Sequence, residues 1–129
     1  MLKVLKRKLY DWFNGVEPLP VDEKFEFNLF LGNLTIGTLR AENGEWFFTY
    51  SDEFRKQNEI KPIVDFPATE REYRSRTLWP FFALRIPSPE QPAVREFIHN
   101  RPDAKADEGI LLKEFGERSI ANPFRLVPV

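Results

Sequence analysis

The stretch FEFNLFLGNLTIGTLRAENGEWFFTY, residues 25–50, decides the fold of this chain. Apolar and polar residues alternate from Phe25 to Leu29, and this period of two is typical of a strand that buries one face. Two dipeptides that favour tight turns, Gly32-Asn33 and Asn43-Gly44, interrupt the pattern. The stretch therefore predicts a three-stranded antiparallel meander over residues 24–50, with a positive φ angle at the Asn43-Gly44 turn.

The last strand of this meander is dense in aromatic residues, Trp46-Phe47-Phe48-Thr49-Tyr50. Alternation places Trp46, Phe48 and Tyr50 on one face, and we expect one face of the strand to pack in the core. A competing interpretation is a platform that stacks the bases of single-stranded nucleic acid on Trp46 and Tyr50. Residues 41–53 carry no surrounding basic pattern, which favours core packing.

Short helices are expected around the sheet. They are predicted over residues 1–14, over Asp52–Gln57, from a start between Pro89 and Pro92 to an end near Asn100, and from Asp107 to Phe115. Ser88 is the expected N-cap of the third of these helices, and Asp107 and Gly116 are the expected cap and terminator of the fourth. Three apolar residues of the third helix are expected to be buried: Val94, Phe97 and Ile98.

Proline punctuates the other segments. Pro62 limits Ile60–Phe66 to an edge or irregular strand, and residues 67–89 are expected to be largely loop, with one helical turn around Phe81. The apolar, proline-broken tail Ser119–Val129 is expected to lie extended on the domain. The whole predicts an α+β fold of one domain, a small antiparallel sheet with peripheral short helices. Residues 1–20 would form an N-terminal amphipathic helix and linker, and residues 21–129 the domain with a C-terminal extension.

Composition narrows the class of protein. A chain of 129 residues with 42% hydrophobic content has material for one core. Its formal charge of −1 lacks the basic excess of a typical nucleic-acid-binding domain, and the absence of cysteine excludes disulfides and thiolate metal sites. No apolar run approaches the ~20 residues that span a bilayer, and residues 1–15 lack the features of a signal peptide, so we expect a cytoplasmic protein.

Candidate catalytic groups are scarce. His99 is the only histidine, and we expect it to be a solvent-exposed residue near a helix end rather than a catalytic base. Carboxylates such as those of Glu70 and Glu72 lie beside basic residues in polar segments, which is typical of a solvated surface. We therefore expect no catalytic residue, no cofactor and no metal.

Several sequence features occur in a fixed order, and together they resemble the HipA N-terminal domain family over roughly residues 25–90. They are the run Leu31–Leu39 with its Gly-Asn turn, the Asn43-Gly44 hairpin and aromatic strand to Tyr50, Phe54, and Pro80-Phe81-Phe82 followed by Leu84 and Pro87. Where the family commonly has Pro-Glu-Gly after the Phe-Phe element, this chain has Pro87-Ser88-Pro89.

The resemblance implies a role in a toxin–antitoxin system. HipA-type proteins join this subdomain to a serine/threonine kinase toxin, but this sequence has no glycine-rich phosphate loop and no Asp-Phe-Gly metal site. In split systems of the family the subdomain is a separate antitoxin, HipS, which acts on a kinase, HipT, beside a DNA-binding HipB. A chain of this size is similar to HipS, which implies a HipT-like kinase as partner and a HipB-like protein nearby.

A partner-binding surface is expected around Trp79, because this large aromatic lies between arginine-rich and proline-rich stretches. The expected contact residues are Trp79, Arg74, Arg76, Leu78 and Pro80. Arg74 and Arg76 would pair with acidic or phosphate groups of the partner, although a solvated loop explains them about as well. Core packing of Trp79 is the competing interpretation, and a general interaction module with an unrelated target is the alternative function.

Overall fold

The computed structural model of the protein describes residues 19–20, 23–101 and 107–129. In this part of the chain the elements are β1 (Phe25–Leu31), β2 (Leu34–Glu42), β3 (Glu45–Tyr50), α2 (Asp52–Lys56), β4 (Tyr73–Ser75), α3 (Pro80–Ala83), α4 (Pro92–His99), α5 (Glu108–Phe115) and β5 (Arg125–Pro128). The α+β fold class predicted from the sequence is confirmed. The helix predicted over residues 1–14 lies outside the described residues.

The meander predicted over residues 24–50 is confirmed by the pairing of β1 with β2 and of β2 with β3, both antiparallel. Asn43 and Gly44 form the second turn with φ angles of 53° and 76°. Two consecutive positive values are the mark of the tight type I′ hairpin, whose twist matches that of the flanking strands. The first turn likewise has a positive φ angle, 58°, at Gly32.

Two short strands that the sequence did not reveal complete the sheet, which has the order β4-β3-β2-β1-β5. Ile60–Phe66 forms no strand, contrary to the prediction, because the edge beside β3 is taken by β4 from a segment expected to be loop. The tail is extended as predicted, and its last part, β5, pairs antiparallel with β1.

One face of the sheet is buried. Trp46, Phe48 and Tyr50 have at most 2% of their surface exposed, so the core packing predicted for this face of β3 is confirmed. Stacking of bases on Trp46 and Tyr50 is correspondingly wrong, since neither ring is accessible. The opposite face carries alternating half-exposed residues, among them Arg40 and Phe47, and the Arg40 guanidinium lies 4.3 Å from the centroid of the Phe47 ring.

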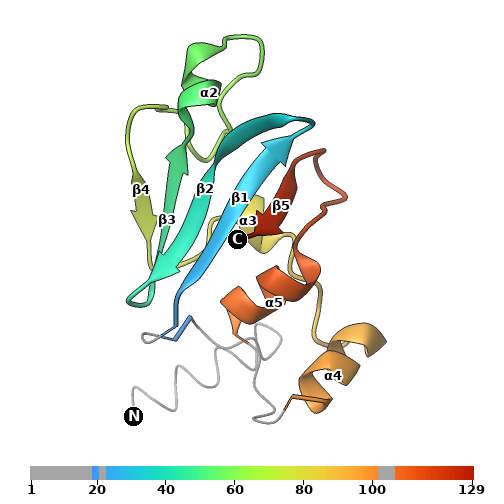
Figure 1. Ribbon diagram of the computed structural model, residues 1–129. Helices are drawn as coiled ribbons and strands as arrows, with labels where there is room; N and C mark the ends of the chain where they lie inside the picture. The colour runs from blue at the N-terminus through green and yellow to red at the C-terminus, as the bar shows by residue number, and fades with distance from the viewer. Residues whose placement is uncertain (1–18, 21–22, 102–106) are drawn as a thin grey trace.

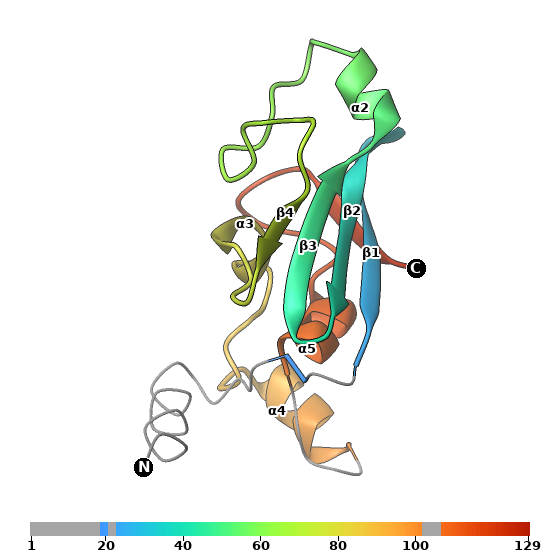
Figure 2. The same ribbon diagram turned by 90° about the vertical axis from the view of Figure 1, so that its left-hand side faces the viewer.

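Figure 1 looks onto the sheet, with β4 at one edge, β5 at the other, and α2 beyond the end of β3, opposite the Asn43-Gly44 turn. Turned by 90° in Figure 2, the sheet is seen nearly edge-on, and α3 and the segment that connects α2 to β4 lie to one side of it. That side is the buried face, where Phe82 of α3 and Phe66 of the connecting segment are fully buried against β3. No helix of the described residues is long and apolar enough to span a membrane.

Caps explain where the longer helices begin. Asp107 accepts a hydrogen bond from the Ile110 backbone N–H and Gly116 follows the last residue of α5, as predicted. The cap predicted at Ser88 is wrong, because α4 begins after Gln91 with Pro92 in its first turn. Proline suits this position, since it has no N–H to leave unpaired and its φ angle is already helical. The Ser88 hydroxyl instead accepts from the Glu90 N–H within the preceding turn.

The helix α4 is less deeply packed than predicted. Val94 is buried, but Phe97 and Ile98 are only half-buried. Together with Leu111 of α5, these residues form a small cluster beside the main core. The helix ends at His99 with Asn100 as its C-cap, in agreement with the predicted end near Asn100.

Candidate partner-binding surface

The loop between β4 and α3 carries most of the residues predicted to bind a partner. Leu78 is 7% exposed and belongs to the core, Trp79 is half-buried, and Pro80 is exposed at the start of α3. Arg74 of β4 and Arg76 are exposed. The predicted set thus extends from β4 through the loop to the first residue of α3, and Leu78 is buried beneath the loop and offers little surface.

Trp79 combines packing with accessibility. Its ring meets the Phe66 ring edge to face, with centroids 4.9 Å apart. Its backbone carbonyl accepts from the N–H groups of Phe82 and Ala83, so the residue also starts α3. A partly open aromatic ring on a short, hydrogen-bonded loop is held in a defined orientation before any partner arrives.

The two arginines differ in what surrounds them. The Arg74 Nε atom lies 2.6 Å from a carboxylate oxygen of Glu45, across the β3–β4 edge. Arg76 forms no ion pair within the described part of the chain. Of the two, Arg76 is the cation that remains available to a carboxylate or phosphate group of a partner.

Glu108, the first residue of α5, contacts the loop between β4 and α3. Glu108 accepts a hydrogen bond from the Leu78 backbone N–H. Burial, together with the adjacent Asp107 carboxylate, raises the pKa of Glu108 to about 7. Burial also raises the pKa of Asp107 above its ordinary value. The Trp79 loop is therefore fastened to a helix that lies about thirty residues further along the chain.

Pro80 lies at the rim of an apolar groove of about 440 Å³, which the sequence did not predict. Its walls come from the segment before β4, from α3 and from the tail before β5. The lining residues are Lys61, Pro62, Ile63, Val64, Asp65, Pro80, Phe81, Leu84, Ala121, Asn122 and Phe124. Val64 and Leu84 expose 92% and 72% of their surface here, although both are aliphatic.

Buried polar contacts fix the first wall of the groove. The Tyr50 hydroxyl donates to the Phe66 carbonyl at 2.7 Å and accepts from the Ile63 N–H at 2.9 Å. Burial raises the pKa of Tyr50 to about 12, so the hydroxyl keeps its proton and its donor role. Asp65 accepts from the Phe81 N–H at 3.0 Å and thereby ties this wall to α3.

Arg85 fixes the opposite wall. Only 4% exposed, it donates to the carbonyls of Gly116, Glu117 and Phe124 and to the Asn122 side chain, at 2.9 to 3.2 Å. It has no carboxylate partner among the described residues, its Nε atom has no hydrogen-bond partner there, and burial lowers its pKa to about 10. A guanidinium can satisfy several carbonyls at once, which explains how one residue holds a whole irregular segment.

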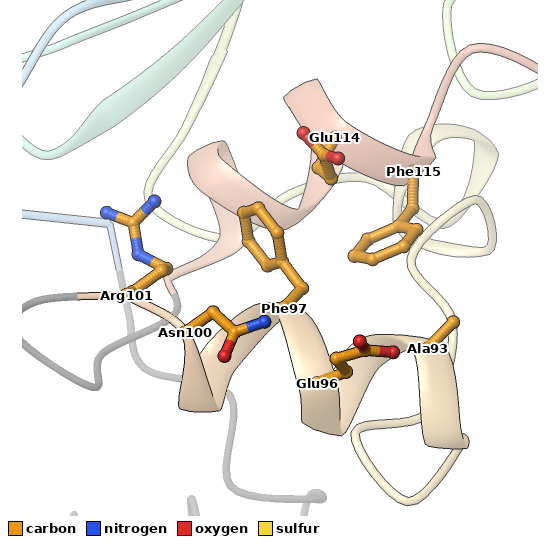
Figure 3. A pocket seen from close by; sticks show the side chains of 7 residues that line it. All are labelled: Ala93, Glu96, Phe97, Asn100, Arg101, Glu114 and Phe115. Carbon is orange, nitrogen blue, oxygen red and sulfur yellow. The ribbon is translucent and has the colours of Figure 1, made fainter.

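A second hollow lies between α4 and α5 (Figure 3). The rings of Phe97 and Phe115 meet edge to face at its centre, 5.5 Å apart, and the Arg101 guanidinium lies 5.5 Å from the Phe97 centroid. Glu96 and Glu114 lie at its rim. The sequence pattern gave no indication of this hollow either.

The sequence offered His99 and carboxylates as candidate catalytic groups. His99 is exposed at the end of α4, as expected, and within the described part of the chain no hydrogen bond or ion pair orients its ring as a catalytic base requires. Within the ranges that the structure describes, no group of three or more histidine and carboxylate side chains is placed to hold a metal ion. What the surface offers is an accessible aromatic, a free cation and an apolar groove in one region.

Comparison with known proteins places this surface in context. The model of the HipA N-terminal domain matches residues 27–120, and a search of the curated proteins found no match. The matched range runs beyond the roughly 25–90 of the sequence resemblance and takes in α4, α5 and part of the tail. Because the match covers most of the chain, from the meander to the segment that Arg85 holds, the protein belongs to the HipA N-terminal domain family.

Proposed function

We propose that the protein is an antitoxin of the HipS kind, which binds a HipT-like serine/threonine kinase in the cytoplasm and restrains it. It works without catalytic activity or a cofactor of its own. A HipB-like DNA-binding protein is the further member of such an assembly. Membership of the HipA N-terminal domain family supports an association with a kinase of this type.

The observation that carries the proposal is that the Trp79 side chain is held in place by contacts and is still partly exposed. An aromatic side chain can bury ~150–250 Å² at an interface, and its contribution is largest where the ring is already held in place. The edge-to-face contact with Phe66 and the Glu108–Leu78 hydrogen bond hold this loop. Little ordering entropy is then lost when a partner covers it.

The proposed mechanism is steric and non-covalent. The Trp79 loop occupies or distorts the kinase site, with Arg76 facing acidic or phosphate groups and Pro80 extending the contact. Arg74, already paired with Glu45, contributes at the rim, and Leu78 acts from the core by shaping the loop. Rim charges chiefly affect the rate of association, whereas a central aromatic affects dissociation.

The test is binding of the purified protein to a HipT-like serine/threonine kinase. Trp79→Ala should weaken binding at least tenfold and abolish protection of cells that express the kinase. Phe30→Ala is the matched control, because it removes a half-buried ring from β1, which lies away from β4 and the Trp79 loop in the sheet. A wild-type protein that neither binds the kinase nor protects cells would refute the proposed function.

The thermal midpoint of the free Trp79→Ala variant distinguishes a role of Trp79 in the interface from a role in the core. An unchanged midpoint with weakened binding supports the anchor. A sharp fall shows that the ring serves the core through Phe66, and the anchor must then be sought at Arg76. Unchanged stability together with unchanged affinity shows that the loop takes no part in binding.

A further inference from the structure

Two strongly exposed aliphatic side chains meet at the apolar groove. Among the described residues four large hydrophobic side chains are strongly exposed: Val64, Leu84, Ile120 and Val129. Val64 and Leu84 line the apolar groove, and Ile120 directly precedes its wall residue Ala121. Scattered exposed aliphatics are ordinary, but a cluster of them around a concave surface marks an interaction site.

Two polar side chains of the groove, Asp65 and Asn122, already form hydrogen bonds within the protein. The Asp65 carboxylate accepts from the Phe81 N–H, and the Asn122 side-chain oxygen accepts from Arg85 and from the Phe124 N–H. An occupant therefore finds few free hydrogen-bonding groups on the walls. Recognition rests on burial of apolar side chains, which is the way an amphipathic helix binds in a groove.

Lys61 supplies the one electrostatic preference. It lies exposed at the groove, and no carboxylate of the described residues forms an ion pair with it. Asp65, the other charged residue of the lining, is turned to α3 by its hydrogen bond with Phe81. An acidic residue next to the apolar face of the occupant would meet the Lys61 ammonium group at the exposed rim of the groove.

The groove is continuous with the surface proposed above. Pro80 lines it and directly follows Trp79, so a partner that covers the Trp79 ring reaches the groove without a gap in sequence or space. We infer that the groove is the second half of the kinase interface, and that it receives an amphipathic segment of the kinase with large aliphatic side chains and an acidic residue facing Lys61. This inference rests on the proposed function, because the occupant belongs to the same kinase.

Substitutions at the exposed positions test the inference without disturbing the core. In titration calorimetry with the HipT-like kinase, Val64→Asp combined with Leu84→Asp should weaken binding at least tenfold. Val129→Asp is the matched control, since Val129 is equally exposed, at 73%, but lies in the strand region paired with β1 rather than at the groove. It should bind like the wild type, and all variants should keep the wild-type thermal midpoint.

Lys61 and hydrogen exchange provide independent measurements. Lys61→Glu should weaken kinase binding several-fold, whereas Lys61→Arg should retain the affinity. Added salt should weaken the contribution of Lys61 to binding, and it should relieve the repulsion that Glu introduces at this position. Amide exchange of the wild-type protein should slow over residues 60–66 and 80–86 when the kinase is added.

The outcomes distinguish the two proposals. If the wild type fails to bind the kinase, the proposed function and this occupant are both refuted. If the wild type binds, and neither the double substitution nor the exchange of residues 60–66 shows an effect, the groove lies outside the interface and this inference alone is refuted.

Discussion

Tyr50 shows how one hydroxyl organises a wall that is distant from it in sequence. Tyr50→Phe keeps the ring in the core but leaves the Ile63 N–H and the Phe66 carbonyl without their partner. Because an unpaired buried polar group costs about 1–3 kcal/mol, the free energy of unfolding should fall by that order. Urea denaturation measures it, and Tyr73→Phe, whose hydroxyl contacts the exposed Ala68 backbone, is the control. Equal losses in the two variants would contradict the prediction.

Glu108 makes stability depend on pH. With its pKa raised to about 7 by burial, the folded protein holds this proton more tightly than the unfolded chain, whose value is 4.5. The stability contributed by the proton is complete below pH 4.5 and is lost as the pH rises through about 7. One pKa unit corresponds to about 1.4 kcal/mol. Since the side chain is partly exposed, we expect a loss of about 2 kcal/mol over this window.

Glu108→Gln removes the titration, so its unfolding free energy should change less between pH 4.5 and 7 than that of the wild type. Glu114→Gln, exposed on the same helix, should leave the wild-type profile unchanged. Urea midpoints across this pH range provide the measurement. A Glu108→Gln profile parallel to that of the wild type would show that a group other than Glu108 causes the pH dependence.

At the scale of single elements, the β2–β3 hairpin depends on its turn. Gly44→Val should destabilise the domain by ~1 kcal/mol or more, because valine cannot adopt a φ angle of 76° without strain. Asn43→Gly, at the neighbouring positive φ angle of 53°, should change stability little, since glycine accepts that conformation. Denaturation midpoints measure both, and an unshifted midpoint for Gly44→Val would contradict the strain argument.

Elements whose signal is local were predictable from the sequence. The meander follows from alternation and two turn dipeptides, and α5 from an aspartate cap and a terminal glycine. By contrast, β4 has only three residues, too few for an alternating pattern to appear. The strand β5 contains Pro128 and forms only through its pairing with β1, which no local pattern reveals.

In the candidate site, too, local features are visible in the sequence and features formed by distant segments are not. The Trp79 loop was predictable because a tryptophan between proline and arginine stretches is a local feature. The groove beside it was not, because three segments far apart in the chain form its walls. Its organisers, Tyr50, Asp65 and Arg85, also bond to distant partners. The single cation in the apolar run Pro80–Pro87 was the one signal that pointed to Arg85.

At the scale of the whole molecule, Arg85 joins α3 to the tail that leads into the sheet. Arg85→Met keeps much of the packing volume but removes four hydrogen bonds to that tail. We expect a loss of about 2 kcal/mol or more, because hydrogen bonds to charged groups are the stronger ones. Amide exchange over residues 116–128 should accelerate selectively, whereas Arg118→Met, on an exposed tail residue, should leave it unchanged. Unaltered exchange in Arg85→Met would mean that β5 alone holds the tail.

The pairing of β1 with β5 has a consequence in time. Asn28 pairs with Val127, so β1 must wait for a segment that is synthesised about 100 residues after it. Contacts so distant in sequence form slowly, because the entropy of closing a long loop is lost before the contacts stabilise the fold. Until then β1 presents an open edge, while the local β2–β3 hairpin can already be in place. The sheet is thus complete only after the tail has been synthesised, and the same late step completes the wall of the groove that Arg85 holds.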